Sequence, residues 1–172
     1  MGYVRKFLRR LLTDKSEPRE VVQILSDKEW DEVTRITMGF EESLGVSPEY
    51  SRSYAMVFTP KDVEIMVMSP YVGLLATYVQ AISNQKFARL KDMLKRQNIR
   101  KVQNVDSGML GGFDCGISLM KGDEMLFLAN IHGNDRVTDG DLSFDGFLFD
   151  SAYMVFPWLE RKLDKLVEDT YI

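Results

Sequence analysis

The sequence predicts an α+β fold, a mainly antiparallel sheet of about five strands with helices packed on it. Several short stretches alternate apolar and polar residues, which is typical of strands. Other stretches repeat apolar residues at helical spacing. The strand stretches follow one another over short turns, which favours antiparallel pairing. The expected order along the chain is α-α-ββ-α-βββ-α.

Length and composition indicate one globular domain over residues 1–172. Hydrophobic residues make up 45% of the chain and charged residues 28%, so a substantial core can form and disorder is not expected. A formal net charge of -4 argues against a protein that coats nucleic acid with its whole surface. There is one cysteine, and no stretch reads as a membrane span or a secretory signal. We therefore expect a cytoplasmic protein.

Residues 1–16 are predicted to form a basic amphipathic helix. Its apolar residues share one side, and Arg5, Lys6, Arg9 and Arg10 share the other. Such a helix could contact an anionic membrane surface or a nucleic acid. Alternatively, its apolar side packs on the domain and the basic residues face water.

A second helix is predicted to begin after Ser26. Ser26 and Glu29 have the spacing of a capping box, in which each residue satisfies the other's backbone N–H. Apolar residues continue at helical spacing from Trp30 to Leu44, and Gly45 follows. Because glycine commonly ends helices, this helix is expected to continue to Leu44.

Residues 54–59 and 63–68 are expected to form a hairpin, with Pro60 in its turn. Ser69 and Pro70 then resemble the N-cap and first residue of a long helix that continues to about Asn98. The apolar side of this helix changes direction near residues 83–85, where we expect a bend.

A short strand over 101–105 precedes the hairpin around which the chain is organised, residues 113–131. Alternation marks both arms, and Gly122 in the turn can adopt a positive φ. The second arm, residues 125–131, is apolar on both faces and is therefore expected to be the more central strand.

The end of the chain is predicted to be a polar loop over residues 132–145 and then a helix from Pro157. The apolar residues of that helix, from Trp158 to Val167, share one face. The sequence leaves open whether residues 152–156 form a strand or a kinked extension of this helix.

The element order from Asp27 onward, αββαβββα, is similar to that of the roadblock and longin type of small regulatory domain. This resemblance is one of topology alone, and fold does not fix function.

Charged residues are segregated along the chain. The stretch from Lys86 to Lys101 contains seven basic residues and one acidic residue. The stretch from Gly122 to Asp150 contains seven acidic residues and one basic residue. On the predicted long helix the basic residues align in a stripe that could meet phosphates or a carboxylate-rich partner, namely Arg89, Arg96 and Arg100. The acidic segment would meet a basic partner through Asp135, Asp139 and Asp141.

Other motifs fall short of a defined site. The glycine-rich residues 108–112 lack the lysine and the serine or threonine of a phosphate loop. The aspartates at 135–145 do not have EF-hand spacing. Cys115 and His132 are the single residues of their types, which excludes a structural zinc within one chain and leaves a Cys–His nucleophile pair as an alternative.

The sequence therefore favours a non-enzymatic protein-binding module without cofactor or metal, either an adaptor or an inhibitor such as a toxin-neutralising immunity protein. One alternative is a nucleic-acid-binding protein that uses the N-terminal helix and the arginine stripe. Another is a metal-assisted hydrolase that uses the loop from Asp135 to Asp141. An open edge strand would also allow a homodimer.

Overall fold

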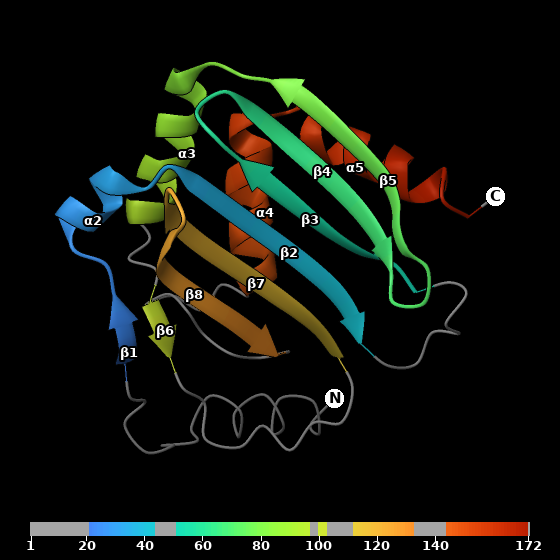
Figure 1. Cartoon of the computed structure of the whole chain (residues 1–172), viewed down its shortest axis with the longest axis horizontal. Helices are drawn as coiled ribbons and strands as arrows, with labels where there is room; N and C mark the ends of the chain where they lie inside the picture. The colour runs from blue at the N-terminus through green and yellow to red at the C-terminus, as the bar shows by residue number, and fades with distance from the viewer. Residues whose placement is uncertain (1–20, 44–50, 97–99, 103–111, 133–143, 172) are drawn as a thin grey trace, which may run out of the picture.

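The computed structural model describes residues 21–43, 51–96, 100–102, 112–132 and 144–171 (Figure 1). The helix predicted over residues 1–16, with Arg5, Lys6, Arg9 and Arg10, lies outside these ranges. The same holds for the glycine-rich residues 108–111 and for Asp135, Asp139 and Asp141.

The described residues form one six-stranded antiparallel sheet, a separate two-stranded ribbon and four helices. The large sheet has the order β5-β4-β3-β2-β7-β8. Its strands are β2 (Arg35–Ser43), β3 (Ser53–Phe58), β4 (Asp62–Ser69), β5 (Gly73–Ala81), β7 (Gly112–Lys121) and β8 (Glu124–His132). The ribbon pairs β1 (Val21–Ile24) with β6 (Arg100–Val102). The helices are α2 (Asp27–Glu32), α3 (Asn84–Arg96), α4 (Phe144–Val155) and α5 (Leu159–Glu168).

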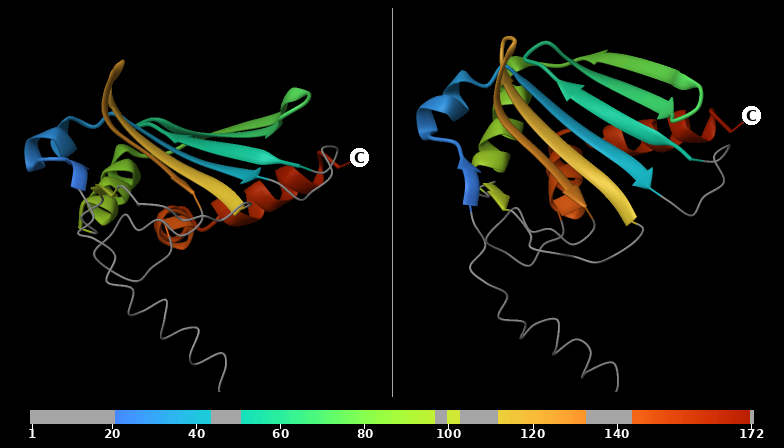
Figure 2. Two further views of the ribbon diagram at one scale, coloured as in Figure 1. Left: turned by 90° about the horizontal axis from the view of Figure 1, so that it is seen from below. Right: turned by 60° about the horizontal axis from the view of Figure 1, so that its bottom comes forward.

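Helices α3, α4 and α5 lie on one face of the large sheet (Figure 2). The strands direct alternate side chains toward these helices, as on β4, where Val63, Ile65 and Val67 are fully buried and the residues between them are partly exposed. The residues that are almost completely buried between sheet and helices include Ile36, Met38, Met56, Phe58, Leu90, Leu94, Ile117, Leu119, Phe127 and Phe156. One hydrophobic core therefore joins the large sheet to the helices.

The predicted α+β class and both predicted hairpins are confirmed, although the sheet has six strands instead of about five. Gly122 has φ 56° in the turn between β7 and β8, as its place in the sequence predicted. The capping box is also confirmed. The Glu29 amide donates to Ser26 Oγ at 3.3 Å, and the Ser26 amide donates to Glu29 Oε2 at 2.7 Å.

The helix predicted to continue to Leu44 is wrong beyond Glu32. Val33 has the extended backbone angles φ -62° and ψ 121°, and β2 begins at Arg35. Residues 35–43 fit a strand because Ile36 and Met38 alternate with partly exposed residues. The stretch fits both the helical spacing of apolar residues and the alternation of a strand. Pairing with β3 and β7 on its two sides selects the strand.

The helix predicted from Pro70 is wrong in its first half. Residues 70–72 form a turn in which the Tyr71 amide donates to Ser69 Oγ at 3.3 Å, and Gly73 follows with φ 86°. Strand β5 then pairs with β4. The bend expected near residues 83–85 is the start of α3, whose buried residues Phe87, Leu90 and Leu94 belong to the predicted second stripe.

Four smaller expectations concern the second half of the chain. The second arm of the organising hairpin is not the more central strand, since β8 is an edge strand and β7 lies between β2 and β8. Residues 152–155 belong to helix α4, which also includes Phe144 and Asp145 from the predicted polar loop. Of the strand predicted over residues 101–105, the described part is Lys101 and Val102 in β6. The observed order therefore differs from the predicted α-α-ββ-α-βββ-α.

Candidate functional site

The predicted arginine stripe is divided between two elements. Arg89 and Arg96 lie in α3, whereas Arg100 is the first residue of β6, where its backbone pairs with Ile24. The prediction that Arg100 shares a helix with the other two is therefore wrong. It assumed a helix to about Asn98, but α3 as described ends at Arg96, and Arg100 begins the strand β6.

A groove of about 710 Å³ lies along the outer side of α3 and is bordered by Met154 of α4. We call it the α3 groove. Its lining consists of Ser83, Gln85, Lys86, Ala88, Arg89, Asp92, Met93, Arg96 and Met154. Residues from two helices thus contribute to one surface.

The sequence of α3 explains why these side chains gather. Lys86, Arg89, Met93 and Arg96 follow one another at intervals of three or four residues, which places them in one row along the helix. The neighbouring side of the helix is anchored in the core by Phe87, Leu90 and Leu94. This burial fixes which row faces outward.

Two other lysines of α3 are used to attach it to α2. Lys91 Nζ donates to the carbonyl oxygen of Asp31 at 3.0 Å, and partial burial lowers the pKa of its ammonium group. Lys95 Nζ lies 3.2 Å from Asp27 Oδ1. These lysines therefore have a structural role.

Arg89 and Arg96 are exposed and, unlike those lysines, do not attach α3 to α2. Among the described residues, neither guanidinium makes a hydrogen bond or an ion pair. Lys86 is also exposed, with its Nζ 5.9 Å from the centre of the Phe156 ring. The groove therefore presents, within the described part of the chain, two unpaired guanidinium groups beside one ammonium group and a single carboxylate, Asp92.

The apolar part of the groove is formed by methionines. Met154 is 64% exposed, and Met93 is partly exposed beside it in the groove lining. Methionine side chains are flexible and polarisable, and are common at surfaces that bind varied apolar partners. A guanidinium can bind a carboxylate through two parallel hydrogen bonds. The arrangement thus suits a ligand that carries carboxylates next to apolar groups.

Sequence reasoning found Arg89 and Arg96 but missed Lys86, Met93 and Met154 as their neighbours. The row of residues 86, 89, 93 and 96 was visible as a helical spacing. The contribution of Met154 could not be seen in the sequence, because α4 was not predicted and Met154 is far from α3 in sequence.

The other predicted sites receive no structural support as metal or nucleophile centres. Within the described residues, no three His, Cys, Asp or Glu side chains are grouped so as to hold a metal ion. In the β7–β8 ladder Cys115 pairs with Ile131, and His132 pairs with Asp114. The side chains of Cys115 and His132 are outside the described set, so the Cys–His pair stays a hypothesis.

No helix in the described part of the chain has the length and apolar character needed to cross a membrane. Comparisons with protein-family models, with curated proteins and with solved structures found no match to this chain.

Proposed function

We propose that this protein is a non-enzymatic protein-binding module whose α3 groove binds an acidic, partly apolar segment of a partner protein. The observation that supports this most directly is the pair of exposed guanidinium groups of Arg89 and Arg96, which have no partner among the described residues, next to the methionines of the same groove. An unpaired charged group has a large free-energy cost only when it is buried. The exposure of the two guanidinium groups is therefore not by itself evidence for a ligand. Their alignment with an apolar strip is what favours a ligand.

We expect long-range electrostatic attraction to guide the partner to the groove and apolar packing to stabilise the complex once it has formed. The whole chain has net charge -4, so its basic residues in the α3 groove are a local exception. An acidic segment would be repelled from most of the molecule and attracted to this groove, which orients the encounter and raises the association rate. Contact with Met93 and Met154 would then add apolar burial, at roughly 25 cal/mol per Å².

The biological role that we propose is that of an adaptor or of an inhibitor, such as an immunity protein that neutralises a toxin, acting in the cytoplasm. The single cysteine supports a reducing compartment. A second partner, basic in character, is proposed for Asp135, Asp139 and Asp141, which lie outside the described residues.

Nucleic-acid binding is the second candidate, because the row formed by Lys86, Arg89 and Arg96 could also contact phosphates. Two features of the groove favour a protein ligand over nucleic acid. Its lining contains the apolar side chains of Met93 and Met154, and it contains no aromatic residue on which a base could stack. The hydrolase hypothesis depends on the loop from Asp135 to Asp141 and gains no support from the groove.

A peptide-display selection tests the proposal and requires no candidate partner. We expect wild-type protein to enrich peptides that combine Asp or Glu with apolar residues. Binding of the enriched peptides should be lost in the double variant Arg89→Glu/Arg96→Glu. The matched control is Arg161→Glu/Lys165→Glu, which makes the same charge change on two exposed residues of α5 and should leave binding intact.

Two further measurements separate the alternatives. Peptide affinity should fall as salt is raised, and Met154→Ala should weaken binding without changing that salt dependence. If the selected peptides bind the arginine double variant as well as wild type, the α3 groove is not the site. If no peptide is enriched while DNA or RNA is retained by wild type and released by the double variant, the nucleic-acid alternative replaces the proposal.

A further inference from the structure

The two edge strands of the large sheet differ in what lies beside them. Strand β8 forms one edge, and β6 of the small ribbon contacts it (Figure 1). Strand β5 forms the other edge and pairs with β4 on one side. No strand among the described residues pairs with its outer side.

The outer side of β5 carries backbone groups that are ready for pairing. The Ile82 amide donates to the Lys61 carbonyl at 2.8 Å, which makes these two residues a hydrogen-bonded pair. Hydrogen-bonded and non-hydrogen-bonded pairs alternate along an antiparallel ladder. Residues 76, 78 and 80 therefore bond to β4, whereas Thr77, Val79 and Ala81 direct their N–H and C=O groups outward.

This edge lacks the usual protection against association. Edge strands of monomeric proteins commonly carry lysines or other charges, prolines or bulges. No charged residue occurs between Glu64 and Lys86, a stretch that includes all of β5. A register shift opposite Met68 disturbs the first residues of β5, but the ladder is regular from Ala76 to Ala81.

Apolar side chains are exposed along the same edge. Val79 is 56% exposed and Leu74 is 59% exposed. In the turn that precedes β5, Tyr71 and Val72 are 69% and 74% exposed. Most of the large apolar side chains that the described residues expose thus lie on or beside one strand.

We infer that β5 is the interface of a homodimer, in which the β5 strands of two copies pair antiparallel around Tyr78 and join the two sheets. This inference does not depend on the proposed function of the α3 groove. In such a pair Thr77 lies opposite Val79 of the second copy on both sides of the two-fold axis. Tyr78 then lies opposite Tyr78 of the second copy and Ala76 lies opposite Gln80, and the threonine–valine and tyrosine–tyrosine pairs are favourable cross-strand pairs.

Charge favours a second copy as the occupant over a foreign partner. An uncharged strand offers nothing that would select an acidic or a basic ligand, in contrast to the α3 groove. Helix α5 lies next to β5, with Lys162 Nζ 3.8 Å from the centre of the Tyr78 ring. This helix carries three acidic and three basic residues, Glu160, Asp164, Glu168, Arg161, Lys162 and Lys165, so its net charge is zero. Two copies of α5 brought near the two-fold axis would therefore add no net charge to the interface.

The test is the mass of the full chain in solution, measured by sedimentation or light scattering over a wide range of concentration. We expect wild type to reach twice the mass of one chain, with little dependence on salt. Val79→Lys places a charge on the interface, and Val79→Pro removes an outward N–H that β4 does not use. Both variants should be monomeric.

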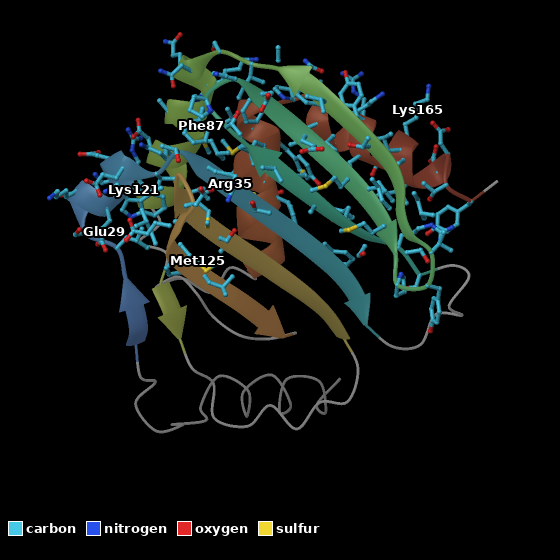
Figure 3. All side chains as sticks on the ribbon, in the orientation of Figure 1. Glu29, Arg35, Phe87, Lys121, Met125 and Lys165 are labelled. Carbon is cyan, nitrogen blue, oxygen red and sulfur yellow. The ribbon has the colours of Figure 1, made fainter. Side chains whose placement is uncertain are left out.

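The matched control is Met125→Lys, which adds the same charge at a residue that is 53% exposed on the other edge strand, β8 (Figure 3). It should remain a dimer. A monomeric wild type at every concentration, or a dimer that persists in both Val79 variants, would overturn the inference.

Hydrogen exchange gives a second measurement if the Val79 variants do not fold. The amides of Thr77, Val79 and Ala81 should become protected in wild type as its concentration rises. Rapid exchange of these amides in a dimeric sample would show that another surface forms the dimer. Because peptide binding at the α3 groove is salt-dependent and is tested with the arginine variants, failure of one proposal leaves the other unaffected.

Discussion

Lys162 lies over the face of Tyr78, with its Nζ 3.8 Å from the ring centre, and so connects helix α5 to the edge strand β5. Tyr78 also contacts Trp158, at 6.3 Å between ring centroids, and its hydroxyl donates to Gln80 Oε1 at 2.9 Å. The open edge of the sheet is thus held in place by side chains from the C-terminal helix.

Replacing Lys162 should loosen this connection. A cation over an aromatic ring contributes about 0.5–1 kcal/mol at a partly exposed site. We expect Lys162→Met, which keeps an unbranched apolar stem, to reduce the free energy of unfolding by about that amount in urea titrations. Lys165→Met, at an exposed lysine of the same helix, should change stability much less. Equal effects of the two substitutions would contradict a specific role for the Lys162–Tyr78 contact.

The stacked rings of Phe58 and Phe156 are expected to be a main source of stability. Their centroids are 5.5 Å apart, and both side chains are fully buried between β3 and the segment that follows α4. Phe156→Ala should cost about 3–5 kcal/mol, because it removes apolar contacts and leaves a cavity. Met154→Ala, two residues away and exposed, should cost less than about 0.5 kcal/mol. Denaturant unfolding of both variants measures the difference, and a loss below about 1 kcal/mol for Phe156→Ala would show that this region repacks easily.

The capping box of α2 should make stability depend on pH in the acidic range. Hydrogen bonds from Ser26 hold the pKa of Glu29 below its ordinary value of 4.5. A lowered pKa in the folded state means that the stabilisation is fully present above the unfolded value and is lost as pH falls through the folded value.

Ser26→Ala should therefore lower the melting temperature at neutral pH, and the difference from wild type should shrink as pH falls below about 4.5. Lys28→Ala, an exposed residue in the same helix, serves as the control. A difference between Ser26→Ala and wild type that does not change with pH would contradict the assigned pKa shift.

Ionisation of Tyr153 should make the stability of the fold depend on pH in the alkaline range. Burial, reinforced by the negative charges of Glu160, Asp164 and Asp150, raises its pKa from 10.0 to about 12. The unfolded chain ionises first as pH rises, so stability that is fully present below pH 10 should decrease between pH 10 and about 12.

Tyr153→Phe removes this ionisation and should flatten the decrease. Tyr71→Phe, at an exposed tyrosine, is the control and should leave the alkaline decrease as in wild type. The measurement is thermal unfolding across this range, together with the absorbance change of tyrosinate. An ionisation of Tyr153 near pH 10 in the folded protein would contradict the predicted shift.

The ion pair between Lys121 and Glu32 shows how charged side chains are used elsewhere in the fold. Lys121 at the end of β7 lies 2.9 Å from Glu32 Oε2, and this hydrogen-bonded pair raises the pKa of the lysine. Glu29 and Lys121 are at the same end of the molecule (Figure 3). At this end, therefore, opposite charges are paired within the chain, whereas Arg89 and Arg96 have no such partner among the described residues.

The sequence by itself determined the features that depend on neighbouring residues. The capping box at Ser26, the glycine turn at Gly122 and the hairpins β3–β4 and β7–β8 follow from local hydrogen bonding, allowed backbone angles and side-chain alternation. The basic row on α3 was also visible, because a helix repeats its faces at a fixed interval.

The tertiary structure alone decided the rest. Residues 35–43 and 73–81 have apolar spacings that fit either a helix or a strand. Pairing with the distant β7 selected the strand for residues 35–43, and pairing with the preceding strand β4 selected it for residues 73–81. Which arm of the last hairpin lies at the edge depends on the pairing of β7 with β2, which is remote in sequence. The α3 groove needs Met154 from α4, and the open edge needs the position of β5 beside β4. The pairing of β2 with β7 and the α3 groove arise from contacts between segments that are distant in sequence, and the free energies of such contacts are not recorded in any local pattern.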